Sequence, residues 1–321
     1  MVVWILFLGV ILAFLAIDLG ILNKTPHIIS TKEASKWTFV WVSISFAFSG
    51  VIYWLYSDNL IANPDKLEAS TAVIKYITGY LIELSLSIDN IFVIAIIFAS
   101  FQIPKKFQHR ILFWGIIGAI VFRGLMIYFG VLLIQKFSWT SYVFGVFLMF
   151  TALKMLFSRG KEAEEFNPKT SVIYRLLGKI IPIDHNVEGG EFFIIKEGKR
   201  FATTAFIALI VIEVMDVVFA LDSVPAILAI TSDPFLVFSS NIFAILGLRS
   251  MYFFLSHMLS KFDYLEYSLI AILLFVGLKM SLKDYMEIPE WGSLAFIASS
   301  LIIGMVISLR MDKMKSRKNQ Q

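Results

Sequence analysis

Long, uninterrupted apolar segments restrict what this sequence can fold into. Each is about 20 residues long, and an α-helix of that length crosses a hydrocarbon core roughly 30 Å thick. Hydrophobic residues make up 58% of the 321-residue chain and charged residues only 16%, against about 25% charged in soluble proteins. With a mean hydropathy of +0.80, these features predict an all-α polytopic membrane protein.

Nine segments are apolar and long enough to be predicted as membrane spans. They cover residues 2–22, 38–56, 72–100, 111–134, 139–157, 202–231, 238–256, 266–283 and 291–309. The first has no basic residues before it and is too long for a secretory signal peptide, so we expect it to be a membrane anchor. An odd number of spans places the two termini on opposite sides.

The distribution of basic residues predicts the orientation. Of the 28 Lys and Arg, 20 fall in the loops and tail on one side of the predicted spans and four on the other side. Loops rich in Lys and Arg stay cytoplasmic, so we expect the N-terminus outside and the C-terminus in the cytoplasm. The chain has no Cys, which excludes disulfides and thiolate sites, and nothing in its charge pattern supports nucleic-acid binding.

Residues 158–200 form the one sizeable segment outside the predicted spans. The segment carries eight basic and seven acidic residues and is too short for an independent core. Its end, residues 191–201, has the pattern of two short strands around Glu197 and Gly198. We expect a small cytoplasmic linker module, and the sequence does not identify a protein partner for it.

Residues 72–157 and 202–283 resemble each other, which indicates an internal repeat. Each copy has two acidic residues six positions apart, which are followed along the chain by an Arg and then by a Lys-Met pair. The equivalent residues are Glu83 and Asp216, Asp89 and Asp222, Asn90 and Ser223, Arg123 and Arg249, and Lys154 and Lys279.

Each copy contains three predicted spans, so the second copy enters the membrane from the opposite face. Such a 3+3 inverted repeat is typical of secondary transporters, whose binding sites lie near the bilayer midplane. The predicted organisation comprises two N-terminal spans in 1–71, the first repeat in 72–157, the linker module in 158–200, the inverted second repeat in 202–283, and the last span with a basic tail in 284–321.

Ionisable residues lie inside the predicted spans, where each costs at least about 2.5–3.5 kcal/mol. Five carboxylates stand against two guanidiniums, which leaves three negative charges unmatched. The acids are Glu83, Asp89, Glu213, Asp216 and Asp222, the bases are Arg123 and Arg249, and Asp18 in the first span is a peripheral candidate. Structural pairing accounts for two acids, so the surplus predicts a proton or cation pathway.

Helix phase limits which of these side chains can meet. At 100° per residue Glu83 and Asn90 face the same way, whereas Glu213 and Asp222 face opposite ways. Pro225 could break the helix and redirect Asp222, or could produce only a packing kink, and the sequence leaves both readings open.

Three other residues near the acids are expected to play no part in transport. Met215 is a soft donor, but we expect it to contribute to packing. Lys154 and Lys279 lie close to span ends, and we expect their side chains to extend to the interface.

The acidic segments resemble the TerC family of integral membrane proteins. The resemblance covers nearly the whole chain and rests on residues 80–93, 213–227, 233–235 and 240–252. It implies a bacterial inner-membrane protein with relatives linked to manganese export and, by name, to tellurite resistance. Carboxylate, amide and hydroxyl oxygens suit a hard divalent cation better than a tellurium oxyanion.

We therefore predict a secondary transporter that exports Mn²⁺, with Ca²⁺ as the less favoured alternative. Arg123 and Arg249 are expected to act as countercharges or gating residues. The chain has no P-loop, and crowded carboxylates can release protons when a cation binds, so we expect proton exchange to drive transport. The predicted metal ligands are Asp89, Asn90, Asp222, Glu83, Glu213 and Asp216.

Two other classes of protein also use acids within a membrane. A membrane scaffold or assembly factor would have a structural metal site and would bind partners through residues 158–200. An intramembrane aspartyl protease would need a Gly-x-Gly-Asp segment, which the chain lacks, so we expect no enzymatic activity.

Overall fold

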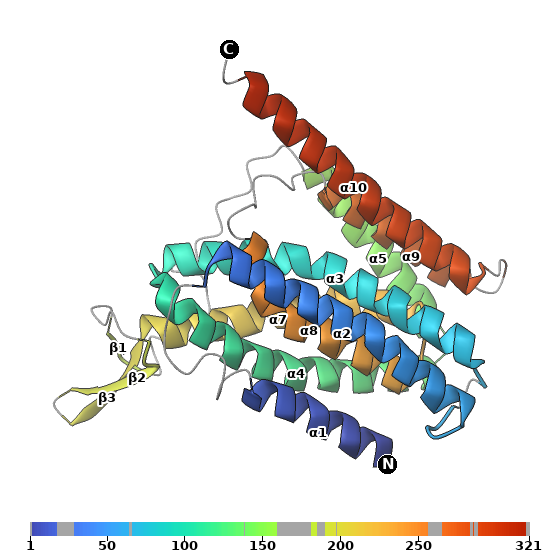
Figure 1. The fold of residues 1–321 in the computed structure, drawn as a ribbon, viewed down its shortest axis with the longest axis horizontal. Coiled ribbons are helices and arrows are strands. Elements are labelled where there is room, and N and C mark those ends of the chain that lie inside the picture. Colours follow the sequence, from blue (N-terminus) through green and yellow to red (C-terminus); the bar gives the residue numbers. More distant parts are fainter. Residues whose placement is uncertain are drawn as a thin grey trace.

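The computed structural model describes most of the chain as helices with one small sheet (Figure 1). The described residues are 2–17, 29–63, 66–137, 139–158, 181–184, 190–196, 198–255, 265–282, 285 and 288–318. The helices are α1 (Val2–Ile17), α2 (Thr31–Ser57), α3 (Ala69–Ser100), α4 (Lys105–Lys136), α5 (Thr140–Ser158), α7 (Thr204–Leu228), α8 (Pro234–Leu255), α9 (Leu265–Ser281) and α10 (Glu290–Lys318).

Six of these described helices are long and apolar enough to cross a membrane, namely α2, α4, α5, α7, α8 and α10. The helix α1 is apolar but shorter. Every predicted span overlaps a described helix, which confirms a helical membrane protein with several spans. The number of spans stays a prediction.

Local capping explains where two of the helices begin. The helix α2 begins at Thr31, seven residues before the predicted span, because the Ser30 hydroxyl accepts a hydrogen bond from the Glu33 N–H at 3.3 Å. The helix α7 begins after Thr203, whose hydroxyl accepts from the Phe206 N–H at 3.4 Å.

The helix α7 continues through Pro225 to Leu228. The break considered near Asp222 is therefore absent. Pro225 lies in the last turn, where its missing N–H removes one backbone hydrogen bond shortly before the helix ends, and membrane helices tolerate such a loss.

The central group of helices consists of α3, α4, α7 and α8. Here α3 packs on α8 and α7, and α4 packs on α7 and α8, while α2 covers α3 and α8. The helix α1 adds aromatic contacts, with Trp4 and Phe7 at 5.2 and 5.4 Å between ring centroids from Phe235 of α8.

A second group, α5, α9 and α10, lies on one side of the central helices (Figure 1). The α5 and α9 backbones approach each other at Gly145 and Gly277. A Cβ at Gly145 would lie 2.8 Å from the Gly277 carbonyl oxygen, and a Cβ at Gly277 would lie 2.8 Å from that of Gly145. Small residues allow such close contact between membrane helices.

The small sheet projects from one end of the central helices (Figure 1). It has the order β1 (Ile183–Asp184), β3 (Lys199–Thr203), β2 (Phe193–Lys196). Strands β2 and β3 are antiparallel, with Lys196 opposite Lys199, which confirms the predicted strands on either side of 197–198. The parallel strand β1 was not anticipated. Most of the predicted 158–200 module lies outside the described residues.

The sheet marks one end of the central helices. Strand β3 leads directly into the N-terminus of α7. The Phe107 ring, near the start of α4, lies against Gly190, and the Tyr252 hydroxyl near the end of α8 donates to Gln108 at 3.1 Å. We call this the sheet end of the bundle, where α4 and α7 begin and α3 and α8 end, and the opposite end is the far end.

Candidate functional site

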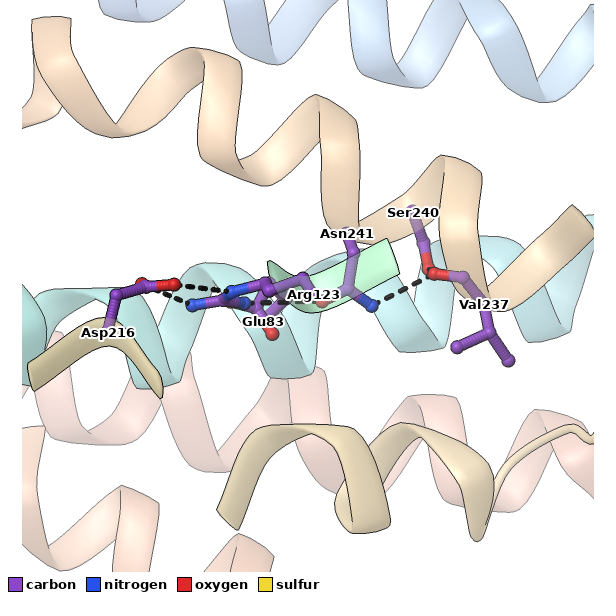
Figure 2. A network of polar contacts seen from close by, with 6 residues as sticks. All are labelled: Glu83, Arg123, Asp216, Val237, Ser240 and Asn241. Atoms are coloured by element: carbon purple, nitrogen blue, oxygen red, sulfur yellow. Dashed lines mark hydrogen bonds and ion pairs between the residues drawn. The ribbon is translucent and has the colours of Figure 1, made fainter. Parts of the chain in front are cut away.

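Arg123 lies at the centre of a buried polar cluster that joins all four central helices (Figure 2). From α4, its Nη1 donates to Glu83 of α3 and, at 3.2 Å, to the Asn241 Oδ1 of α8. Its Nη2 and Nε donate to the two carboxylate oxygens of Asp216 on α7, at 3.0 and 3.3 Å. We refer to these four residues as the Arg123 cluster.

The Arg123 cluster carries an uncompensated negative charge. One guanidinium stands against two carboxylates, and the side chains of Glu83 and Arg123 are 0% and 1% exposed. The second carboxylate oxygen of Glu83 is buried without a hydrogen-bond partner in the described structure. A buried, unbalanced charge of this kind favours the uptake of a proton or a cation.

Asn241 is a member of the cluster that sequence reasoning missed. Its Nδ2 donates to the Val237 carbonyl at 2.9 Å (Figure 2), which orients Oδ1 toward Arg123. The signal available in the sequence was an amide within an apolar span, because such a group requires partners in hydrocarbon.

A cavity of about 470 Å³ lies between the four central helices. Its walls are apolar apart from Asn90, Asp216 and Arg249. Asp216 belongs to both the cavity wall and the Arg123 cluster. One of the two carboxylates that bind Arg123 therefore borders empty space.

Arg249 borders two cavities. Besides the central cavity, it lines a smaller one of about 290 Å³ with Glu33 and Trp37, near the start of α2 at the sheet end. The repeat equivalent of Arg123 is thus also buried, at 6% exposure, and borders both cavities.

Glu213 lies one turn before Asp216 on α7, against two glycines of α4. A Cβ at Gly118 would overlap its carboxylate, and a Cβ at Gly115 would lie 3.8 Å from its Oε1. Its Oε2 is buried and has no hydrogen bond in the described structure. The absence of a side chain at Gly118 is therefore what makes room for this acid.

Asp222 contacts a different helix. Its Oδ1 accepts a hydrogen bond from the Thr151 hydroxyl of α5 at 3.2 Å. Glu213 faces α4 and Asp222 faces α5, which confirms the opposite orientations predicted from helix phase.

The structure separates the predicted metal ligands into several places. Glu83 and Asp216 meet at Arg123, and Asn90 and Asp216 share the cavity wall, but Glu213 and Asp222 lie elsewhere. The described residues contain no group of three or more His, Cys, Asp or Glu that could hold a metal ion. The Asp89 side chain and Asp18 lie outside the described part of the chain, so the ligand set stays a prediction.

Lys279 forms an ion pair near the end of its helix, which the sequence did not predict, while the extension of its side chain to the interface stays a prediction. Its Nζ lies 3.0 Å from Glu290 Oε2 and 2.9 Å from the Ser293 hydroxyl. Lys75 lies 3.0 Å from the other Glu290 oxygen and also donates to the Ile230 carbonyl at 2.8 Å. We refer to Lys75, Lys279 and Glu290 as the Glu290 cluster; it links α3, α9 and α10.

Comparison with known proteins identifies the family of the chain. A family model described as the integral membrane protein TerC family matches residues 68–318. The chain belongs to the TerC family. This TerC protein is 44% identical over 306 residues to an uncharacterized membrane protein of Myxococcus xanthus, covering 95% of this chain and 91% of that one.

Other relatives of the TerC protein carry a functional name. A putative membrane-bound redox modulator Alx of Photorhabdus laumondii is 40% identical over 318 residues, covering 99% of this chain and 97% of that one. A protein with the same name from Salmonella typhi is also 40% identical, over 319 residues, covering 98% and 96% of the two chains. No solved structure matches the chain.

Proposed function

We propose that this TerC protein is a secondary transporter that exports Mn²⁺ from the cytoplasm, with protons as the counter-ion. The observation that carries the proposal is the Arg123 cluster. Glu83 and Asp216, which are equivalent in the sequence repeat, bind one guanidinium between them and retain an excess negative charge. The guanidinium occupies the position that a bound cation would take.

The ligand chemistry supports a divalent cation as the transported ion. When Arg123 moves away, Glu83 and Asp216 offer carboxylate oxygens beside the Asn90 amide on the cavity wall. Oxygen ligands of this kind suit Mn²⁺ and Ca²⁺. In the proposal, Asp89, Asp222 and Glu213 complete the site as the helices move, and protons leave the carboxylates as the ion binds.

The helix contacts support the proposed 3+3 inverted repeat. In the repeat, α3 is equivalent to α7, α4 to α8 and α5 to α9. The contact between α3 and α8 therefore has its equivalent in the contact between α7 and α4, and both are present. The contact between α5 and α9 is its own equivalent. The helix α3 ends, and α7 begins, at the sheet end, so the two equivalent helices run in opposite directions.

The sheet end is proposed to face the cytoplasm of a cell whose inner membrane holds the protein, with the N-terminus outside. Exposed basic residues at this end support the orientation through the excess of Lys and Arg in cytoplasmic loops. They are Lys105, Lys106, Arg110, Lys199 and Arg200.

The test is Mn²⁺ flux into proteoliposomes that contain the purified protein, with Ca²⁺, Mg²⁺ and Zn²⁺ as competitors. Glu83→Gln, Asp216→Asn and Asp89→Asn should each lower the flux at least about tenfold, which corresponds to about 1.4 kcal/mol of lost stabilisation. Glu290→Gln is the matched control, because it removes a carboxylate from the Glu290 cluster, and it should leave most of the flux.

Absence of flux for every cation, in protein that still binds Mn²⁺, would replace the transporter with a membrane scaffold that has a structural metal site. The name redox modulator, carried by two of the relatives, suits the transporter if the redox effect follows from the cellular metal level. The chain has no Cys, so its own residues cannot perform thiol–disulfide exchange.

A further inference from the structure

The Glu290 cluster carries one positive charge more than its acid balances. Lys75 and Lys279 lie 3.0 Å from different carboxylate oxygens of Glu290, and the three side chains form no further ion pair with described residues. The two lysine side chains are 14% and 12% exposed, so they are mostly buried but can be reached from outside the protein. Because burying a charge is costly unless it is paired, the excess charge favours a bound anion.

Each lysine of the cluster retains a hydrogen-bond donor for a further ligand. An ammonium group has three N–H donors. Lys279 uses two of them, on Glu290 and on the Ser293 hydroxyl. Lys75 also uses two, on Glu290 and on the Ile230 carbonyl. Among the described residues the third donor of each lysine has no partner, and since both ammonium groups bind one carboxylate, an anion with several oxygens can accept from both.

The position of the cluster between helices is typical of a lipid site. Lys75 lies near the beginning of α3, Lys279 in the last turn of α9 and Glu290 at the beginning of α10. Basic pockets between membrane helices bind the phosphate-bearing headgroups of lipids, and lysine is a common phosphate ligand. The cluster therefore has the charge, the donors and the location that a lipid phosphate requires.

Exposed tryptophans at the far end indicate how deep the cluster lies in the bilayer. Tryptophan and tyrosine gather at membrane–water interfaces, at the level of the lipid headgroups. Trp291 directly follows Glu290 and is 67% exposed. Trp54, near the end of α2, and Trp139, just before α5, are 55% and 60% exposed at the same end. These residues place the cluster at the level of the phosphates of one leaflet.

We propose that the Glu290 cluster binds the phosphate group of an anionic phospholipid from the leaflet around the far end. The remaining donors of Lys75 and Lys279 bind the phosphate oxygens, and the net charge of the lipid balances that of the cluster. A zwitterionic phospholipid fits less well, because its cationic headgroup would lie close to the two lysines. The site is separate from the proposed transport site, since its residues do not line the central cavity.

A lipid bound at this site connects the two groups of helices. Lys75 belongs to α3 in the central group, whereas Lys279 and Glu290 belong to α9 and α10 in the second group. The helix α10 lies beside α3 at the far end and diverges from it toward the C-terminus (Figure 1). The bound phosphate therefore adds hydrogen bonds at the place where the two groups meet, and we expect it to stabilise the folded protein.

The test follows the thermal unfolding midpoint of the purified protein in neutral detergent as phosphatidylglycerol is added. A ligand of the folded state raises the midpoint with a concentration dependence that gives its Kd. Lys75→Gln and Lys279→Gln should each raise this Kd about fivefold, which corresponds to about 1 kcal/mol for one basic residue. Glu290→Gln should lower the Kd, because it removes a negative charge that competes with the phosphate. Lys136→Gln, at an exposed lysine in the last turn of α4, is the matched control and should leave the Kd unchanged.

Phosphatidylcholine and inorganic phosphate, added in place of phosphatidylglycerol, identify the ligand. Equal stabilisation by phosphatidylcholine overturns the preference for an anionic lipid, and stabilisation by inorganic phosphate alone indicates a site for free phosphate and overturns the lipid. A Kd that Lys136→Gln raises as much as Lys279→Gln indicates a general attraction to basic residues and overturns the site. If the cluster lysine variants do not fold, Glu290→Gln decides, since a lower Kd supports the site and an unchanged or higher Kd rejects it. Mn²⁺ flux is not part of the measurement, so each outcome is independent of the proposed transport function.

Discussion

Two clusters in the protein, each with three charged residues, have opposite charge composition and differ in burial. In the Arg123 cluster one base lies between two acids, and its Arg123 and Glu83 side chains are no more than 1% exposed. In the Glu290 cluster one acid lies between two bases, at 26% exposure for Glu290 and 14% and 12% for Lys75 and Lys279.

The contribution of an ion pair to the stability of the protein therefore depends on how deeply the pair is buried. The excess positive charge of the Glu290 cluster reaches water at the end of the helices, where ion pairs contribute little. In the Arg123 cluster, Asp216 is 12% exposed at the cavity, but Arg123 and Glu83 are at most 1% exposed, so Glu83 depends on Arg123 for its countercharge. Four variants, given in decreasing order of expected effect, test this difference.

Arg123→Gln should destabilise the protein most, by about 3–5 kcal/mol, because it leaves two buried carboxylates without their cation. The measurement is the thermal unfolding midpoint of purified protein in detergent. Adding Glu83→Gln and Asp216→Asn should restore much of the lost stability. A loss that this triple variant does not recover would mean that Arg123 acts through packing alone.

Gly118→Val should cost about 1–3 kcal/mol, because the new side chain overlaps the Glu213 carboxylate and forces it to move. Gly50→Val is the matched control in α2, where a Cβ meets nothing within 4 Å. The free energy of unfolding in a denaturing detergent titration compares the two. Equal losses would show that Glu213 shifts freely and is not fixed by α4.

Asn241→Leu should cost about 1 kcal/mol, since it removes one neutral acceptor from Arg123 while both carboxylates remain. The free energy of unfolding in a denaturing detergent titration measures this loss. Unchanged stability would show that the Asn241 amide does not stabilise Arg123.

Glu290→Gln should have the smallest effect, about 0.2–1 kcal/mol, because the pair is partly exposed and Lys75 keeps its hydrogen bond to the Ile230 carbonyl. The effect should shrink further at high salt, which screens exposed pairs. A loss as large as that of Arg123→Gln would contradict the comparison drawn from burial.

The sequence predicted that two of the acids in the spans pair with arginines, but it identified neither the partners of Arg123 nor that of Lys279. Charged residues within apolar spans must pair, and the repeat already related Glu83 to Asp216. The Glu290 cluster was missed because its members lie far apart in sequence and near span ends, where a lysine can reach water without a partner. The sequence offered one indication of this cluster, because Lys75, Lys279 and Glu290 all lie near the same side of the predicted spans.

Side-chain geometry within α7 was only partly predictable. A period of 3.6 residues correctly placed Glu213 and Asp222 on opposite faces. The effect of Pro225 depended on its distance from the end of the helix, which the sequence does not define. That Gly118 makes room for Glu213 required the three-dimensional structure, because the two residues lie on different helices.

The contact between Gly145 and Gly277 has a consequence for how this protein tolerates mutation. Each glycine faces the backbone of the other helix at a distance that no larger residue allows. A larger residue at one of the two positions therefore cannot be compensated by a smaller residue at the other, because no amino acid is smaller than glycine. In a saturation library, we expect these two positions to accept almost no change, while the lipid-facing residues around them accept most apolar ones.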